Sequence, residues 1–176
     1  MLFGVFMALA SCLASGVAWA ANIDGTGRAD FLVGTSKADT IQGFRGDDII
    51  KGRASGDTLR GYGGNDILAG GRDNDSMFGG DGTDEMRGGS GDDRMYGGPG
   101  RDIMYGGDGN DTTDGQGGGD TLVGGPGRDR IIAGRGTRHR VFAKDGEQDL
   151  ICVNPTSAGQ IVTADRKDEF VPNNSC

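Results

Sequence analysis

The sequence has little of what a packed globular core or a catalytic centre is made of. Of its 176 residues only 34% are hydrophobic and 6% are aromatic, and there is a single histidine. So few apolar side chains argue against a large conventional core. One histidine, without a His-Glu-x-x-His sequence, excludes a zinc protease site, and no lysine follows the glycines as in a phosphate-binding loop. We therefore expect a protein that is not an enzyme.

Positive charge is also scarce. Eighteen lysines and arginines stand against 26 aspartates and glutamates, so the net charge is -8. Nucleic acid is bound by basic surfaces that neutralise phosphates, and this balance argues against such a partner. An acidic chain is better suited to binding cations.

Long uncharged stretches are missing except at the start, where residues 1–21 carry no charge. This stretch ends in Ala18-Trp19-Ala20, a small-x-small pattern, and we interpret residues 1–20 as a cleaved signal peptide. The mature chain would then be secreted by a bacterial Sec-type route, with no membrane span. Two alternatives remain open: a lipid anchor on Cys12, which follows Leu-Ala-Ser, or an uncleaved membrane anchor.

Cysteine is rare, with three in the chain. If Cys12 leaves with the signal peptide, Cys152 and Cys176 remain as an even pair. In an oxidising compartment they would form a disulfide worth about 3 kcal/mol in the chain-entropy model. The alternative is two free thiols.

Glycine, in contrast, is abundant and periodic. Of 37 glycines, 31 lie between Gly25 and Ile132. Cutting the chain every nine residues from Gly25 gives twelve units without an insertion or deletion, with glycine at position 1 in all of them. This period excludes collagen, which repeats every three residues, and a structureless linker.

Two further columns of the repeat carry its chemistry and its core. Position 6 is always aspartate: Asp30, Asp39, Asp48, Asp57, Asp66, Asp75, Asp84, Asp93, Asp102, Asp111, Asp120 and Asp129. Position 8 is aliphatic or methionine in every unit but one, where it is Thr113. Glycines at positions 1, 2 and 4 permit sharp turns, and the alternation over positions 7 to 9 predicts a short strand with position 8 facing inward. Two units would make one coil, giving six coils in all.

The unit Gly-Gly-x-Gly-x-Asp-x-hydrophobic-x resembles the RTX (hemolysin-type) calcium-binding nonapeptide. Full turns of this kind begin at Gly79, Gly88, Gly97, Gly106 and Gly124. The resemblance implies an all-β fold, a parallel β-roll with about twelve repeats over residues 21–132. It also implies calcium bound between turns n and n+2 by the aspartate and by backbone carbonyls near the turn glycines. Those glycines are Gly79, Gly82, Gly88, Gly91, Gly97, Gly100, Gly106 and Gly109.

The residue types of the turn fit calcium, which takes oxygen ligands from carboxylates and carbonyls. Zinc or copper would need histidine or cysteine, and the repeats contain neither. The aligned aspartates would repel one another, and the inward-facing side chains at position 8 bury little apolar surface. We therefore expect folding to be coupled to calcium binding. The alternative is that the aspartates only cap turns.

Not every turn should bind calcium equally. Several early repeats replace the glycine at position 4, and cations such as Arg28 and Lys37 enter these turns, where they could replace the charge of a metal. We therefore expect about five calcium ions. The stronger ligands would be Asp66, Asp84, Asp93, Asp102, Asp111, Asp120 and Asp129, and the weaker ones Asp30, Asp39, Asp48, Asp57 and Asp75.

The segment after the repeats is predicted to differ from them. After Ile132 the period fails, with Arg138 where the next aspartate belongs, and we expect residues 133–176 to form a small C-terminal cap. The single histidine, His139, is predicted to lie on the surface.

Phe78 and Tyr96 both occupy position 9 of their repeats and should stack on one face of the roll. Exposed columns of this kind leave an alternative function open, a calcium-stabilised surface adhesion module that binds a glycan or a protein.

Overall fold

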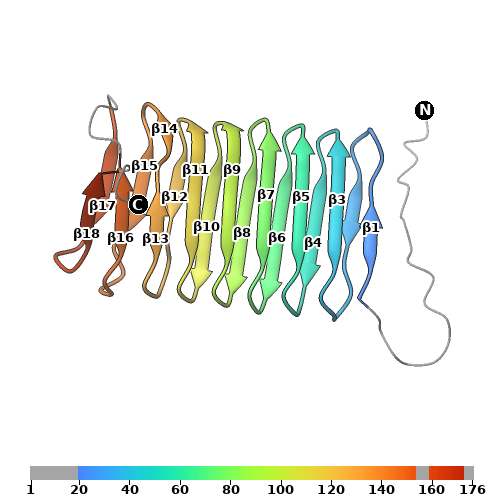
Figure 1. Ribbon diagram of the computed structural model, residues 1–176, viewed down its shortest axis with the longest axis horizontal. Coiled ribbons are helices and arrows are strands. Elements are labelled where there is room, and N and C mark those ends of the chain that lie inside the picture. Colours follow the sequence, from blue (N-terminus) through green and yellow to red (C-terminus); the bar gives the residue numbers. More distant parts are fainter. Residues whose placement is uncertain (1–19, 154–158, 173–176) are drawn as a thin grey trace.

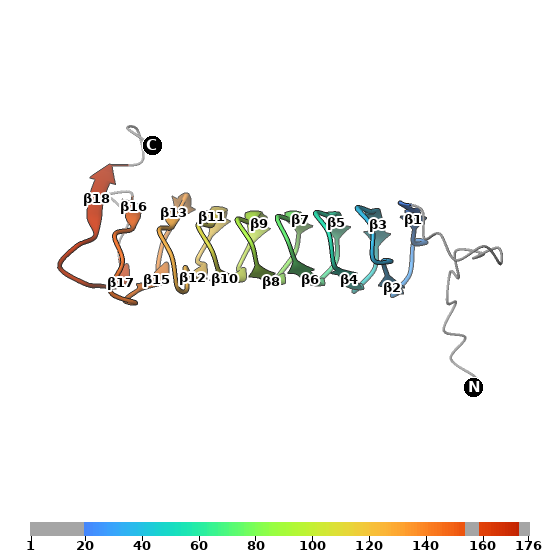
Figure 2. The same cartoon turned by 90° about the horizontal axis from the view of Figure 1, so that it is seen from below.

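The protein is an elongated solenoid of parallel strands in the computed structural model, which describes residues 20–153 and 159–172 (Figures 1 and 2). The chain winds between two facing sheets, so that successive strands alternate from one sheet to the other, except that β13 and β14 lie in the same sheet. The all-β parallel roll expected from the repeat is confirmed. Residues 1–19, with Cys12 and all but the last residue of the predicted signal peptide, and residue Cys176 lie outside the described residues.

The first sheet, here called sheet A, contains every odd strand up to β13, with β14 beside β11 and with β16 and β18 at the end. Its strands are β1 (Asn22–Asp24), β3 (Thr40–Arg45), β5 (Thr58–Gly63), β7 (Ser76–Asp81), β9 (Arg94–Gly100), β11 (Thr112–Gly118), β13 (Arg130–Ile132), β14 (Arg135–Gly136), β16 (Leu150–Val153) and β18 (Glu169–Pro172).

The second sheet, sheet B, contains the even strands up to β12, followed by β15 and β17. Its strands are β2 (Phe31–Val33), β4 (Ile49–Arg53), β6 (Ile67–Arg72), β8 (Glu85–Ser90), β10 (Ile103–Asp108), β12 (Thr121–Val123), β15 (Arg140–Ala143) and β17 (Ile161–Ala164). No helix occurs in the parts of the chain that the structure describes, so none there could cross a membrane.

The register between coils follows the repeat. Leu59 pairs with Met77, and Leu68 with Met86, in each case two nonapeptides apart. Many strands are longer than the three residues predicted, because they continue through the glycines of the following turn. In β5 and β7, for example, Gly63 pairs with Asp81. The glycine turns are therefore part of the sheets.

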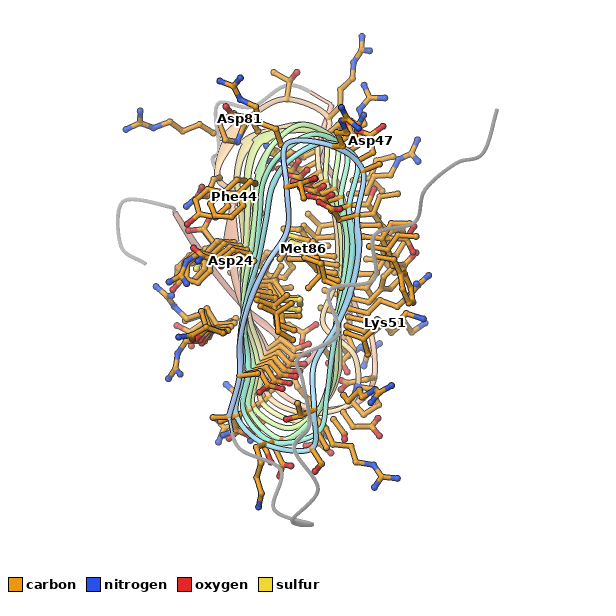
Figure 3. All side chains as sticks on the ribbon, turned by 90° about the vertical axis from the view of Figure 1, so that its right-hand side faces the viewer. Asp24, Phe44, Asp47, Lys51, Asp81 and Met86 are labelled. Carbon is orange, nitrogen blue, oxygen red and sulfur yellow. The ribbon has the colours of Figure 1, made fainter. Side chains whose placement is uncertain are left out.

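Two facing columns of side chains, one from each sheet, fill the space between the sheets. The residues at position 8 are at most 2% exposed, including Thr113, and four consecutive members are methionines. In Figure 3, which looks along the roll, Met86 of sheet B lies in the middle of the coil. Because the roll is narrow, each sheet contributes a single layer of side chains to the apolar core, as the inward-facing position 8 predicted.

The strands continue beyond Ile132, where the nine-residue period ends. β15 and β17 extend sheet B, while β16 and β18 extend sheet A. The pairing offset changes here: Val141 lies opposite Leu122, and Ile151 opposite Ile131, so residues have been inserted in the turns. About eight coils result, in place of the six expected from twelve units.

Candidate metal sites at the edges of the roll

The repeat aspartates gather in two rows inside the two edges of the roll. One row joins Asp30, Asp48, Asp66, Asp84, Asp102 and Asp120, and the other joins Asp39, Asp57, Asp75, Asp93, Asp111 and Asp129. Each is at most 9% exposed. Within a row, the backbone N–H of one aspartate donates to Oδ1 of the aspartate in the next coil, over 2.7–3.0 Å. One carboxylate oxygen is thus used by the fold itself.

The second oxygen has no such partner. Oδ2 is buried without a hydrogen bond in ten repeat aspartates and in two aspartates beyond them. These are Asp48, Asp57, Asp66, Asp75, Asp84, Asp93, Asp102, Asp111, Asp120, Asp129, Asp149 and Asp165. A buried acceptor left without a partner is costly, and a buried charge without one is more so. The rows therefore need a counter-charge, either protons or cations.

The first glycine of each turn makes room for this oxygen. A Cβ built on Gly61 would collide with Oδ2 of Asp66, and one on Gly88 with Oδ2 of Asp93. The same holds for three further predicted glycines, Gly79, Gly97 and Gly106. The invariant glycine at position 1 is thus explained by space, because the carboxylate folds over it.

The glycine at position 4 brings turn carbonyls together. Gly82 and Gly100 have φ values of +140° and +153°, and a Cβ on Gly100 would collide with the carbonyl oxygen of Gly82 in the preceding coil. Gly91 and Gly109 share this geometry, at +123° and +134°. Coils therefore stack backbone against backbone at the edges. Backbone oxygens also lie close to the carboxylates, since a Cβ on Gly79 would collide both with Oδ2 of Asp84 and with the carbonyl oxygen of Gly97 in the next coil.

Burial strongly perturbs these carboxyl groups. It raises the pKa of Asp75, Asp102 and Asp129 to about 7, from an ordinary value of 3.8. Neighbouring carboxylates of the same row raise the pKa further, whereas the N–H donated to Oδ1 lowers it. Burial likewise raises the pKa to about 6 for Asp48, Asp57, Asp66, Asp93, Asp111 and Asp149. These rows hold negative charge only at a considerable cost.

The first two repeats differ from all others. Oδ2 of Asp30 accepts the backbone N–H and the hydroxyl of Thr26, at 2.6 and 2.9 Å. Oδ2 of Asp39 accepts the N–H of Thr35 at 2.5 Å, and its Oδ1 accepts the Thr35 hydroxyl at 3.2 Å. These two carboxylates are satisfied without any ion.

The sequence predicted a different reason for weak calcium binding in the early turns, namely that cationic side chains replace the charge of the metal. Arg28 and Lys37 are exposed, and the ion pairs found in the described part of the chain do not include them. Threonine at position 2 was the signal in the sequence that would have identified these two repeats. The turns of Asp57 and Asp75 retain the standard geometry, because Ser55 and Asp73 at position 4 both adopt φ +69°.

The prediction that His139 lies on the surface is wrong, since the residue is fully buried. An extra residue in this turn places His139, and not Arg138, in line with the first row. The backbone N–H of Asp120 donates to Nδ1 of His139 over 3.2 Å, as it would to the next aspartate. Nδ1 also lies 3.3 Å from Oδ2 of Asp120. Histidine thus replaces aspartate at the end of one row, while Asp149 continues the other.

The donor set favours calcium over transition metals. Within the described residues no group of three or more histidine, cysteine, aspartate or glutamate side chains could hold a metal, because carboxylates of one row are a whole coil apart. An ion in the rows would need backbone carbonyls as additional ligands. Calcium accepts such a mixture of carboxylate and carbonyl oxygens.

Comparison with known families agrees with this chemistry. The family model of the RTX calcium-binding nonapeptide repeat matches residues 24–59, 43–77, 51–86, 78–113 and 114–137. The matches together cover about two thirds of the chain, which therefore belongs to this family of calcium-binding repeats. No curated protein matches the chain.

Proposed function

We propose that the protein is a secreted, non-enzymatic calcium-binding roll, in which ions bind between the glycine-rich turns of successive coils. The observation that carries this proposal is the pair of buried rows of Oδ2 atoms without hydrogen-bond partners. Calcium would supply the positive charge and accept the oxygen ligands that such rows offer. Asp66, Asp84, Asp93, Asp102, Asp111, Asp120 and Asp129 would hold the ions together with nearby turn carbonyls.

The contacts of Oδ2 suggest a different division between stronger and weaker calcium ligands. Asp48, Asp57 and Asp75 have the same open Oδ2 as the stronger ligands and belong with them, whereas Asp30 and Asp39 are occupied by threonines. Counting neighbours with open Oδ2 atoms gives four pairs on the first edge and five on the second. The residue composition of the turns favours about five calcium ions, and the nine pairs set the upper limit.

Folding would be coupled to calcium binding, because the empty rows place many carboxylates at a raised pKa along a thin core with one layer of side chains from each sheet. Residues 1–20 would direct export and be removed. Cys152, which is buried in β16, would form a disulfide with Cys176 and fasten a C-terminal cap of residues 133–176. In the calcium-poor cytosol the chain would stay unfolded until it is outside.

The test is far-UV circular dichroism of the full chain, treated with EDTA and then titrated with Ca²⁺ or, in parallel, Mg²⁺. We expect a coil-to-β transition with Ca²⁺ at about 0.1–1 mM and none with Mg²⁺ over the same range. A β spectrum that is complete in EDTA and unchanged by calcium would overturn coupled folding.

Exposed aromatic residues favour a second candidate function, a calcium-stabilised adhesion module. Phe44 and Tyr62 form one stacked pair on the outer face of sheet A, and Phe78 and Tyr96 form another, as predicted for the latter two. Retention of the folded protein on immobilised glycans would support this function, and loss of retention after EDTA would show that calcium maintains the binding face.

A further inference from the structure

The stack of Phe44 and Tyr62 on the outer face of sheet A ends abruptly. Their ring centroids are 5.5 Å apart and the planes differ by 8°, so one face of Tyr62 is covered by Phe44. The residue opposite Tyr62 in the next coil is Gly80, which offers no ring to cover the other face. Tyr62 is 45% exposed, and its ring closes one end of a gap above Gly80.

A hollow of about 410 Å³ occupies this place, lined by Arg60, Tyr62, Phe78, Gly79, Gly80 and Asp81. Phe78 forms its side wall and is itself held between Tyr96, with ring centroids 5.2 Å apart, and the guanidinium of Arg60, 5.2 Å from the ring centroid. Asp81 lies at the rim, exposed. Figure 3 shows that Phe44 projects outward from this face, on the same side of the coil as Asp24.

The backbone keeps the hollow open. Gly80 has φ +114°, and a Cβ there would collide with the carbonyl of Tyr62. Gly98 in the following coil has φ +115° and is restricted in the same way by the carbonyl of Gly80. Because neither position accepts a side chain without strain, the gap beside Tyr62 results from the turn geometry and does not depend on the rotamer of a neighbour.

We propose that this hollow binds a neutral sugar ring of a glycan, stacked on the free face of Tyr62. The apolar face of a pyranose suits an aromatic wall, and small pockets of this kind gain specificity from a few polar groups at the rim. Arg60 can only donate hydrogen bonds and the Asp81 carboxylate can only accept them. Adjacent sugar hydroxyls do both, so one neutral ring satisfies both rim residues.

Charge separates this ligand from other ring compounds. A nucleotide would bring phosphate towards Asp81 and towards a chain of net charge -8. A cationic ring would meet the guanidinium of Arg60. This binding site rests on the adhesion function proposed above and gives it a location and a ligand, whereas the proposed calcium ions would lie at the edges and only maintain the face that carries Tyr62.

The experiment is isothermal titration calorimetry of the full chain in excess calcium, after circular dichroism has verified the β spectrum. The probes are neutral hexasaccharides of glucose, xylose, mannose, galactose and N-acetylglucosamine. We expect at least one of them to bind. Tyr62→Ala should weaken that binding about tenfold or more, since it removes the stacking surface, whereas Tyr62→Phe should retain it.

Tyr105→Ala is the matched control. Tyr105 is an exposed tyrosine on β10 of the other sheet, beside Arg87, and its loss should leave sugar affinity unchanged. Asp81→Asn should weaken binding without changing the β spectrum. The proposal is overturned if folded wild-type protein binds none of the hexasaccharides, or if Tyr62→Ala binds as well as wild type. Neither result bears on calcium-coupled folding, which the EDTA titration tests separately.

Discussion

At the scale of single residues, the two carboxylate oxygens of the repeat aspartates have different roles, except in Asp30 and Asp39. Oδ1 accepts the N–H of the aspartate one coil before it and so ties the coils together, while Oδ2 makes no hydrogen bond and would be available for an ion. Replacing aspartate by asparagine keeps an oxygen acceptor for the N–H and removes the negative charge. This substitution therefore separates the structural role from the proposed metal-binding role.

We expect Asp93→Asn to reduce calcium uptake by one or two ions, because Asp93 lies between two coils with open Oδ2 atoms. Asp39→Asn should leave uptake unchanged, since Thr35 already satisfies that carboxylate. Equilibrium dialysis with ⁴⁵Ca²⁺ measures both. Equal losses in the two variants would contradict the division between the first coil and the rest.

His139 provides a test in the opposite direction. Its imidazole takes the place of a carboxylate at the end of one row, and calcium is bound poorly by nitrogen. We expect His139→Asp to raise calcium uptake by one ion, because it supplies the missing oxygen ligand beside Asp120. His139→Asn, which adds no charge, serves as the control. Uptake that is the same in the aspartate variant as in wild type would contradict this assignment.

At the scale of strands and turns, the nine-residue period was sufficient to predict the coil. Position 8 alternates with polar neighbours and must face inward, and glycine at positions 1 and 4 marks the turn. The strand length was underestimated, because glycine is a poor strand former and its pairing depends on the coil above. The placement of His139 and the register of the strands after Ile132 could not be predicted, since an inserted residue changes the register without leaving a periodic signal.

Thr113 is the one polar residue in the inward column, on β11 between the levels of Met95 and Ile131. Its hydroxyl is buried and makes no hydrogen bond. We expect Thr113→Val to stabilise the roll by about 1 kcal/mol or more, because it removes an unsatisfied polar group at nearly constant volume. Thermal unfolding in calcium measures this change. Thr112→Val, the same substitution at the neighbouring outward position, should have little effect.

At the scale of the whole molecule, the two aspartate rows make the stability of the roll depend on pH, and the direction of this dependence should be opposite with and without calcium. Without metal, the folded state raises the pKa of many aspartates from 3.8 to about 6 or 7, so between these values it binds more protons than the unfolded chain. Stability of the metal-free roll must then fall as pH rises through this window. With calcium, protons compete with the ions and acid weakens binding.

Circular dichroism in EDTA should therefore show more β structure at about pH 5 than at about pH 8. In millimolar calcium the order should be inverted, with the highest unfolding temperature on the alkaline side of about pH 7. Unfolding temperatures that rise with pH in EDTA would show that the carboxylates are stabilised by something other than protons or metal. Well above about pH 7, where these carboxyl groups are deprotonated in both the folded and the unfolded chain, the metal-free profile should be flat.

The threonine-capped first coil has a consequence for the order of assembly. It is the part of the repeat array whose carboxylates are satisfied by the chain alone, through Thr26 and Thr35. Each later coil adds to a ready-made template, as in a one-dimensional array with nearest-neighbour coupling. Folding nucleated at this coil would proceed from the first repeat towards the last, with one ion-bound coil added after another.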